Sequence, residues 1–207
     1  MHAKLSVTQI TKKIKGDAEN FDIKLKRPKF AEESEKLTGT ERGTAIHTFF
    51  QYCDFDNAQN DLESEIRRMT EKGYISIPQA NSINRENVRA FFGSRLFKRI
   101  CESSEVYREK KFMVAASDID MNNDIIKIFK KSDGMIKGII DLAFVENGKL
   151  IIVDYKSDHS ISAERLAERY KMQLELYSHA LEMTTDYEVS ELYLYSFELR
   201  REIGIEI

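Results

Sequence analysis

The sequence predicts one α/β domain in which helices flank a mixed central sheet. Three observations predict this fold class. Helical periodicity dominates residues 40–103, strand-like apolar runs begin near residue 105, and the dipeptide Asn147-Gly148 separates two of those runs as a two-residue hairpin turn would. A chain of 207 residues, 42% hydrophobic and 32% charged, has the length and composition of a soluble globular domain with a sizeable core.

The first part of the chain carries the weakest pattern. Residues 1–13 are expected to form a short helix that is capped by Ser6 or Thr8. Residues 14–39 show no clear period and contain Pro28, which is incompatible with a regular helix, so we expect an extended arm there.

Three segments then place apolar residues at helical spacing: residues 40–55, 60–74 and 84–103. The last segment is long enough for one or two helices. The second segment is expected to end at Gly73, because glycine readily adopts the left-handed conformation that closes a helix.

From residue 105 onward the pattern becomes strand-like. Four apolar runs are expected to be strands: residues 105–117, 124–132, 135–146 and 149–157. A long amphipathic helix is expected at residues 162–185, and one or two strands at residues 189–207. The domain therefore divides into an N-terminal arm, a helical part and a sheet core: residues 1–40, 41–104 and 105–207.

Composition limits the classes of function. The net charge is −3, so contact with nucleic acid would depend on local basic clusters such as residues 24–29 and 95–100, and such clusters are more often solvated faces. No apolar run reaches the length of a membrane-spanning helix and no apolar signal segment begins the chain, so a cytoplasmic protein without membrane contact is expected. Cys53 and Cys101 are expected to be buried free thiols, too few for an iron–sulfur cluster or a zinc site.

Charged residues interrupt the apolar hairpin. If pairing begins with the residues that flank the turn, Asp141 lies opposite Asp154, and Lys156 points to the same face because it is two residues further on. Two opposed carboxylates repel each other unless a cation lies between them, and Mg²⁺ or Mn²⁺ prefers such oxygen ligands. The pattern alone equally allows an exposed face on which Lys156 neutralises both acids.

Other candidate residues are weaker when taken alone. His47 stands on an apolar helix face, where a histidine is more often a core or surface residue than a ligand. Gln173 and Tyr177 are four residues apart on one helix face, joined by Tyr170, which an ordinary amphipathic helix would also produce. Glu109 could support the site or form a surface ion pair.

Several stretches, taken together, resemble a known family. The segments GIIDLAF (138–144), IIVDYKSD (151–158) and YKMQLELYSHALE (170–182), with ERGTAIHTFF (41–50) and YREKKF (107–112), resemble the RecB-type nuclease domain of the PD-(D/E)XK superfamily. KLSVTQI (4–10) resembles the start of that domain in the AddA subunits of bacterial AddAB helicase–nucleases. One departure is Ile140, which stands where the superfamily's name calls for proline.

The resemblance implies a restriction-endonuclease-like core and a role for each candidate residue. It implies that Asp141, Asp154, His47 and the Tyr155 carbonyl are metal ligands, and that Lys156 is catalytic together with the two aspartates. It further implies that one helix face borders the active site and contacts DNA through Tyr170, Gln173 and Tyr177, with Glu109 as a possible supporting residue.

The resemblance also implies an activity. We expect an Mg²⁺-dependent exodeoxyribonuclease, with Mn²⁺ as a possible substitute, which cleaves single-stranded DNA and serves a helicase–nuclease in double-strand break repair and recombination. The sequence lacks G-x-x-x-x-G-K-[ST], so ATP would act only through helicase domains elsewhere in a longer protein. A second, AddB-like subunit is the expected partner.

Two alternatives remain open from the sequence. One is a catalytically silent module that keeps the fold in order to bind DNA or a partner, although the intact acids and lysine count against it. The other is a stand-alone or CRISPR-associated nuclease of the same fold, many of which carry a cysteine cluster that this chain lacks.

Overall fold

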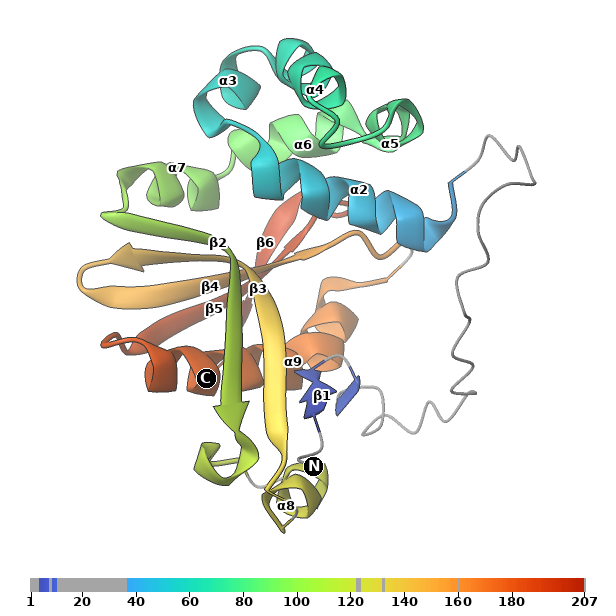
Figure 1. Cartoon of the computed structure of the whole chain (residues 1–207). Helices are drawn as coiled ribbons and strands as arrows, with labels where there is room; N and C mark the ends of the chain where they lie inside the picture. The colour runs from blue at the N-terminus through green and yellow to red at the C-terminus, as the bar shows by residue number, and fades with distance from the viewer. Residues whose placement is uncertain are drawn as a thin grey trace.

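The computed structural model describes residues 4–7, 9–10, 37–121, 124–131, 133–159 and 161–206. Within these residues a six-stranded sheet is flanked by helices on both faces (Figure 1), so the expected mixed α/β fold with helices toward the N-terminus is confirmed. The strands are β1 (Lys4–Ser6), β2 (Glu105–Ala115), β3 (Met135–Glu146), β4 (Lys149–Lys156), β5 (Val189–Ser196) and β6 (Arg201–Ile205). The helices are α2 (Gly39–Tyr52), α3 (Phe55–Asn60), α4 (Leu62–Glu71), α5 (Ile77–Ser82), α6 (Arg85–Phe92), α7 (Arg95–Glu102), α8 (Asp124–Lys131) and α9 (Ala163–Thr184), with a 3-10 turn at Ala116–Asp118.

The sheet is mixed. The order of its strands is β1-β3-β4-β5-β6, and β2 pairs with β3 outside that path. β1 runs parallel to β3 and β4 runs parallel to β5, while the other pairs are antiparallel. The parallel pair β4 and β5 requires a crossover connection, which α9 provides.

The β3–β4 hairpin forms as the sequence predicts. Asn147 and Gly148 both have positive φ, 53° and 76°, which is the requirement of the two-residue turn that matches the twist of a hairpin. Pairing begins with Glu146 opposite Lys149. The predicted register therefore holds from the turn as far as Leu142 opposite Val153, one pair before the two aspartates.

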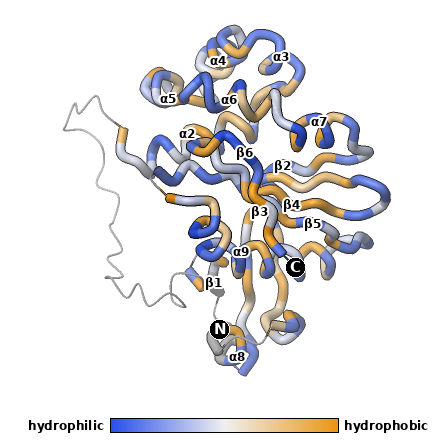
Figure 2. The backbone as a smooth tube through the Cα atoms, turned by 180° about the vertical axis from the view of Figure 1, so that it is seen from behind, coloured by the Kyte–Doolittle hydropathy of each residue, from blue (hydrophilic) through white to orange (hydrophobic). Residues whose placement is uncertain are grey.

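Two hydrophobic cores lie on opposite faces of the sheet. The helical-side core joins α2–α7 to residues such as Leu142 and Phe144 of β3. The α9-side core joins α9 to residues such as Ile140 and Val145 of the same strand. The apolar strands at the centre of the molecule are visible from behind in Figure 2.

An aromatic cluster fixes the helical layer to the sheet. Phe91 is fully buried, and its ring centroid lies 4.8 Å from those of Phe50 and Tyr195 and 5.6 Å from that of Tyr155. These contacts join α6, α2, β4 and β5. They hold α2, which carries His47, against the strand that carries the Asp154–Lys156 motif.

The start of α2 is set by a reciprocal cap. The Thr38 side chain accepts a hydrogen bond from the Glu41 amide at 3.2 Å, and the Thr38 amide donates to the Glu41 carboxylate at 2.9 Å. This arrangement satisfies two backbone donors at the helix start. It therefore defines where α2 begins, two turns before His47.

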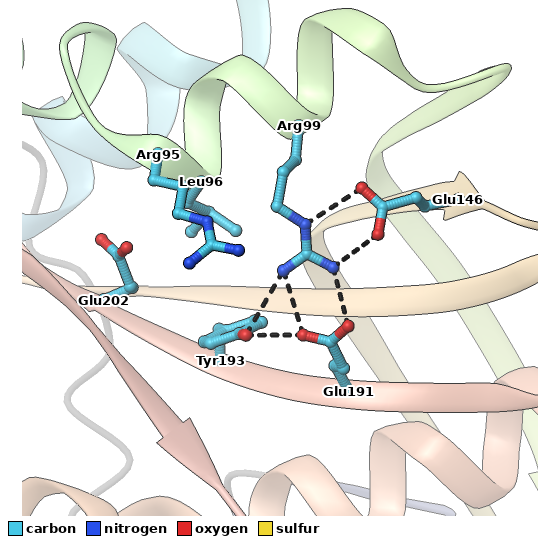
Figure 3. Close-up of a pocket in the computed structure, with 7 residues that line it drawn as sticks. All are labelled: Arg95, Leu96, Arg99, Glu146, Glu191, Tyr193 and Glu202. Carbon is cyan, nitrogen blue, oxygen red and sulfur yellow. Dashed lines mark hydrogen bonds and ion pairs between the residues drawn. The ribbon is translucent and has the colours of Figure 1, made fainter.

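Arg99 of α7 joins that helix to strands β3 and β5 of the sheet. Its guanidinium donates to Glu146 of β3 at 3.0 and 2.7 Å and to Glu191 of β5 at 3.0 and 2.7 Å, with Tyr193 at 3.3 Å (Figure 3). Both carboxylates raise the pKa of Arg99. Arg99, the most buried cation of the basic cluster at residues 95–100, thus serves a structural network of ion pairs.

Some expectations are corrected by the structure. Residues 124–131 form helix α8 and not a strand. Ile126 is buried, and the basic residues Lys130 and Lys131 lie in the last turn, where they complement the helix dipole. The short helices α3 and α5 were not expected. Cys53 is buried as predicted, but Cys101 is exposed, so that half of the prediction was wrong.

The N-terminal expectations are met only in part. Residues 4–6 form β1 and not helix, while the Ser6 side chain caps the helical residues that follow by accepting from the Gln9 amide at 3.3 Å. Thr8 and residues 11–36, with the expected arm and the basic cluster 24–29, lie outside the described residues. Among the described helices, none has the length and apolar character needed to cross a membrane.

The aromatic cluster gives a test of the fold. Phe91→Ala should lower the free energy of unfolding by about 3–5 kcal/mol, because it removes a fully buried ring and leaves a cavity between the helices and the sheet. Urea denaturation followed by circular dichroism measures this. A loss below about 1 kcal/mol would show that the layers are held together by other contacts.

Candidate active site

The strands β3 and β4 part at the two aspartates. Their backbone pairing ends with Leu142 opposite Val153, so Asp141 and Asp154 are the next residues along. In place of a further backbone pair, Oδ2 of Asp141 accepts a hydrogen bond from the Tyr155 amide at 2.7 Å. β4 stays paired with β5 to its last residue. Where the strands separate, the Asp141 side chain therefore supplies the hydrogen-bond acceptor that the backbone of β3 supplies elsewhere.

The alternation of β3 also changes at Asp141. Ile140 packs into the α9-side core, whereas Leu142, two residues further on, packs into the helical-side core. On β2, the register passes from Arg108 opposite Leu142 to Lys110 opposite Ile140 and skips Glu109, which has a φ of 52°. Such a conformation costs a non-glycine residue about 1–3 kcal/mol, and irregularities of this kind re-aim side chains at functional sites.

Three side chains converge at this irregularity. His47, Glu109 and Asp141 offer ligand atoms that all lie within 4.8 Å of one another, and Nδ1 of His47 is 3.0 Å from Oδ1 of Asp141. They line a pocket of about 900 Å³. Glu109, which the sequence only weakly indicates, thus lies beside His47 and Asp141 at the same site.

The charges of the three groups are coupled. Burial raises the pKa of Glu109, and the negative charge of Asp141 raises it further. Burial lowers the pKa of His47, but the Asp141 carboxylate outweighs that effect, so the pKa of His47 is raised. Asp141 therefore makes negative charge on Glu109 less favourable, and a positive charge between the two groups would relieve that repulsion.

This donor set fits a hard divalent cation. Carboxylate oxygens are the ligands that Mg²⁺ and Mn²⁺ prefer. Mg²⁺ is usually held by one or two carboxylates and completes its shell with water and phosphate oxygens, which a partly exposed pocket permits. The convergence of two acids and one imidazole meets that requirement without further protein groups.

Asp154 and Lys156 form a second, more deeply buried pair beside the first group. Nζ of Lys156 lies 2.5 Å from Oδ2 of Asp154, and the Asp154 side chain is 3% exposed. Burial raises the pKa of Asp154 to about 6, although Lys156 opposes this shift. Burial lowers the pKa of Lys156, but Asp154 and Asp141 together outweigh it and leave the pKa raised. Lys156 is therefore protonated at neutral pH.

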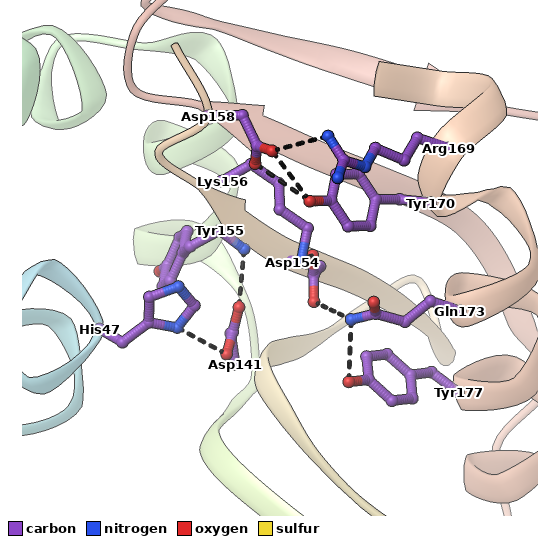
Figure 4. A network of polar contacts seen from close by, with 10 residues as sticks. All are labelled: His47, Asp141, Asp154, Tyr155, Lys156, Asp158, Arg169, Tyr170, Gln173 and Tyr177. Atoms are coloured by element: carbon purple, nitrogen blue, oxygen red, sulfur yellow. Dashed lines mark hydrogen bonds and ion pairs between the residues drawn. The ribbon is translucent and has the colours of Figure 1, made fainter. Parts of the chain in front are cut away.

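Helix α9 supports this pair. Nε2 of Gln173 donates to Oδ1 of Asp154 at 2.8 Å and lies 3.0 Å from the Tyr177 hydroxyl (Figure 4). Nζ of Lys156 lies 4.0 Å from the centre of the Tyr170 ring, which suits a cation–π contact. The three helix residues expected from the sequence are thus brought to the site.

Their surroundings differ from the expectation of a nucleic-acid contact face. Gln173 and Tyr177 are buried, 8% and 5% exposed, and their polar atoms point to Asp154 and to each other. Tyr170 is partly exposed, and its hydroxyl donates to Asp158 at 3.1 Å. The structure favours a positioning role for Gln173 and Tyr177, and contact with DNA stays a prediction.

Other residues around the pocket were missed by sequence reasoning. One group lies on α2 at helical spacing with His47, a polar stripe that could have been found from its period: Thr40, Gly43, Thr44 and Gln51. A second group follows β4 in a loop whose position depends on the fold: Ser157, Asp158 and His159. These residues form the rim of the pocket.

Comparison with known proteins agrees with this geometry. The family model of the PD-(D/E)XK nuclease superfamily matches residues 21–204, and the chain belongs to that superfamily. More particularly, it is similar to the A subunits of two ATP-dependent helicase/nucleases: that of Clostridium acetobutylicum, 34% identical over 216 residues, and that of Clostridium botulinum (strain Hall), 34% identical over 212 residues. Each match covers 98% of this chain but only 17% of the relative's length. The predicted resemblance is confirmed at this level.

The role of Glu109 can be tested by removing its charge. Glu109→Gln should weaken Mn²⁺ binding, measured by calorimetry, by at least the 10–100-fold that loss of an outer-shell partner typically causes. Glu102→Gln, an exposed site with the same charge change, should leave Mn²⁺ affinity unaltered. Equal affinities of the Glu109→Gln variant and the wild type would remove Glu109 from the site.

The same variant should change stability with a pH dependence. Because the folded state raises the pKa of Glu109, its negative charge destabilises the metal-free fold above that pKa, and this cost disappears as the carboxyl is protonated on acidification. Glu109→Gln should therefore melt above the wild type at pH 8 in EDTA, with no gain at pH 4. Saturating Mg²⁺ should reverse the order at pH 8, because it stabilises the wild type more.

Proposed function

We propose that this chain is an Mg²⁺-dependent deoxyribonuclease domain that hydrolyses phosphodiester bonds in single-stranded DNA, acting as an exonuclease. The observation that carries the proposal is the convergence of His47, Glu109 and Asp141 beside the buried Asp154–Lys156 pair. Membership in a nuclease superfamily gives the class of reaction.

On this proposal His47, Glu109 and Asp141 hold the cation, and Asp154 and the Tyr155 carbonyl are further candidate ligands at its buried side. A divalent cation at that position would polarise the scissile phosphate and lower the pKa of a water molecule. Asp141 has a second function, because its other oxygen accepts from the Tyr155 amide. That hydrogen bond fixes the carboxylate before substrate arrives.

Lys156 would supply fixed positive charge to the reacting phosphate. Its ammonium is held by Asp154 at 2.5 Å and by the Tyr170 ring. A preorganised charge in a partly dry site stabilises developing negative charge more strongly than a mobile one in water. Gln173 would act through Asp154 by holding the carboxylate that holds the lysine.

The proposal extends to a larger protein. The relatives are named as the A subunits of ATP-dependent helicase/nucleases, and the chain matches 17% of their length. We infer that the chain is one domain of such a protein, which would supply the helicase domains and, with an AddB-like second subunit, serve double-strand break repair and recombination in the bacterial cytoplasm. The motor would then deliver the single strand to this site and raise its effective concentration.

Lys156 gives the sharpest test of the chemistry. Lys156→Ala should lower the rate of cleavage at saturating Mg²⁺ on the order of 10²–10³-fold, because a preorganised charge is lost from the reacting phosphate. Mn²⁺ affinity should not weaken, because the substitution removes a positive charge next to the metal site. Retained Mn²⁺ binding also shows that the variant is folded. Cleavage near the wild-type rate would reduce Lys156 to an ion-pair partner of Asp154.

The substrate can be tested with the isolated chain. Mg²⁺ alone should support cutting of a single-stranded oligonucleotide, ATP should have no effect, and blunt duplex of the same sequence should resist. The reason is that the sequence has no G-x-x-x-x-G-K-[ST] loop to bind ATP for strand separation. End-labelled substrates on denaturing gels measure all three. Efficient duplex cutting would indicate a self-sufficient endonuclease, and binding of DNA without any cutting would indicate a silent module.

A further inference from the structure

Four exposed side chains form a strip on the outer halves of β2 and β3. Backbone pairing places Lys111 opposite Ile139 and Met113 opposite Lys137, and directly opposed residues share a face of the sheet. All four are exposed, Met113 by 54% and Ile139 by 44%. Large apolar side chains at that exposure, next to each other on a strand pair, are unusual in a sheet face that has no partner.

The charges and apolar groups of the strip alternate. Each strand contributes one lysine and one apolar residue, so the two lysines are diagonal neighbours, about 7–8 Å apart at their backbone positions. Neither Lys111 nor Lys137 forms an ion pair with a carboxylate among the residues that the structure describes. The strip is therefore locally positive in a chain whose net charge is −3.

The strip continues directly into the candidate active site. Ile139 lines the pocket of about 900 Å³ together with Glu109 and Asp141. It also lines a second, mainly apolar pocket of about 460 Å³ with Lys111 and Met113. Strands rise about 3.3 Å per residue, so Lys111 is rooted about 6–7 Å beyond Glu109. A ligand chain bound in the active site would reach the lysines within one or two of its own units.

We propose that this strip is the track along which single-stranded DNA enters the site, with phosphates on Lys111 and Lys137 and bases against Met113 and Ile139. The inference rests on the proposed nuclease function and deepens it. Single strands present both charged phosphates and unstacked apolar base faces, and the alternating strip matches both. A duplex encloses its base faces, so it would leave the apolar half of the strip without a partner.

The test measures binding and not turnover. Fluorescence anisotropy of labelled oligothymidylate in EDTA, over a range of salt concentrations, gives the affinity and its salt slope. The double variant Lys111→Ala/Lys137→Ala should bind more weakly, and its slope of log affinity against log salt should be shallower by about 1.4, since each lost phosphate contact on a single strand contributes about 0.7. Met113→Ser/Ile139→Ser should weaken binding about tenfold without changing the slope, because apolar contacts release no counterions.

The matched control is Lys72→Ala/Lys149→Ala, which removes the same charge from the C-terminal cap of α4 and from the first residue of β4, away from the strip. It should leave affinity and slope close to those of the wild type. If the strip variants bind with wild-type affinity and slope while the wild-type chain cuts DNA in Mg²⁺, the track is overturned and the nuclease proposal stands. If the wild-type chain binds no Mn²⁺ and cuts no single strand, the proposed function itself is overturned.

Discussion

The hydrogen bond from the Tyr155 amide to Asp141 organises this molecule, because it marks the point where two strands stop pairing. A backbone donor in a buried strand must find an acceptor, and here a carboxylate supplies it. The side chain is thereby held rigidly at the mouth of the site, while β3 is free to turn its next residues into the other core. The same interaction satisfies the sheet and positions a candidate metal ligand.

The site depends on charges that oppose one another at close range. Asp141 and Glu109 repel, and Asp154 is buried, where Lys156, His47 and the hydrogen bond from Gln173 favour its charged form. Such an arrangement lowers the stability of the fold, because burial disfavours the ionised form of a carboxyl group. The left-handed conformation of Glu109 adds strain at the same place. Local costs that coincide in one group of neighbouring side chains are the expected signature of a functional site.

Much of the site could be predicted because a hairpin converts sequence into geometry. Once Asn147-Gly148 fixes the turn, the register follows by counting as far as Leu142 opposite Val153, which brings Asp141 and Asp154 to the point where the strands part. The position of Glu109 could not be derived in that way, because it depends on how β2 pairs with β3 across a long connection. The burial of Gln173 and Tyr177 likewise depends on the packing of α9, and an amphipathic period cannot tell a buried polar partner from a ligand contact. Helix α8 was mistaken for a strand because a short apolar run satisfies both periods.

The position of a bound cation shows directly whether Asp141 and Glu109 hold a metal. Crystals of the chain grown with Mn²⁺ would give an anomalous difference map in which the metal is located independently of the protein coordinates. We expect a single strong peak within bonding distance of Asp141 and Glu109, beside His47. A map with the peak elsewhere, for example at the Arg99 network, or with no peak at saturating Mn²⁺, would contradict it.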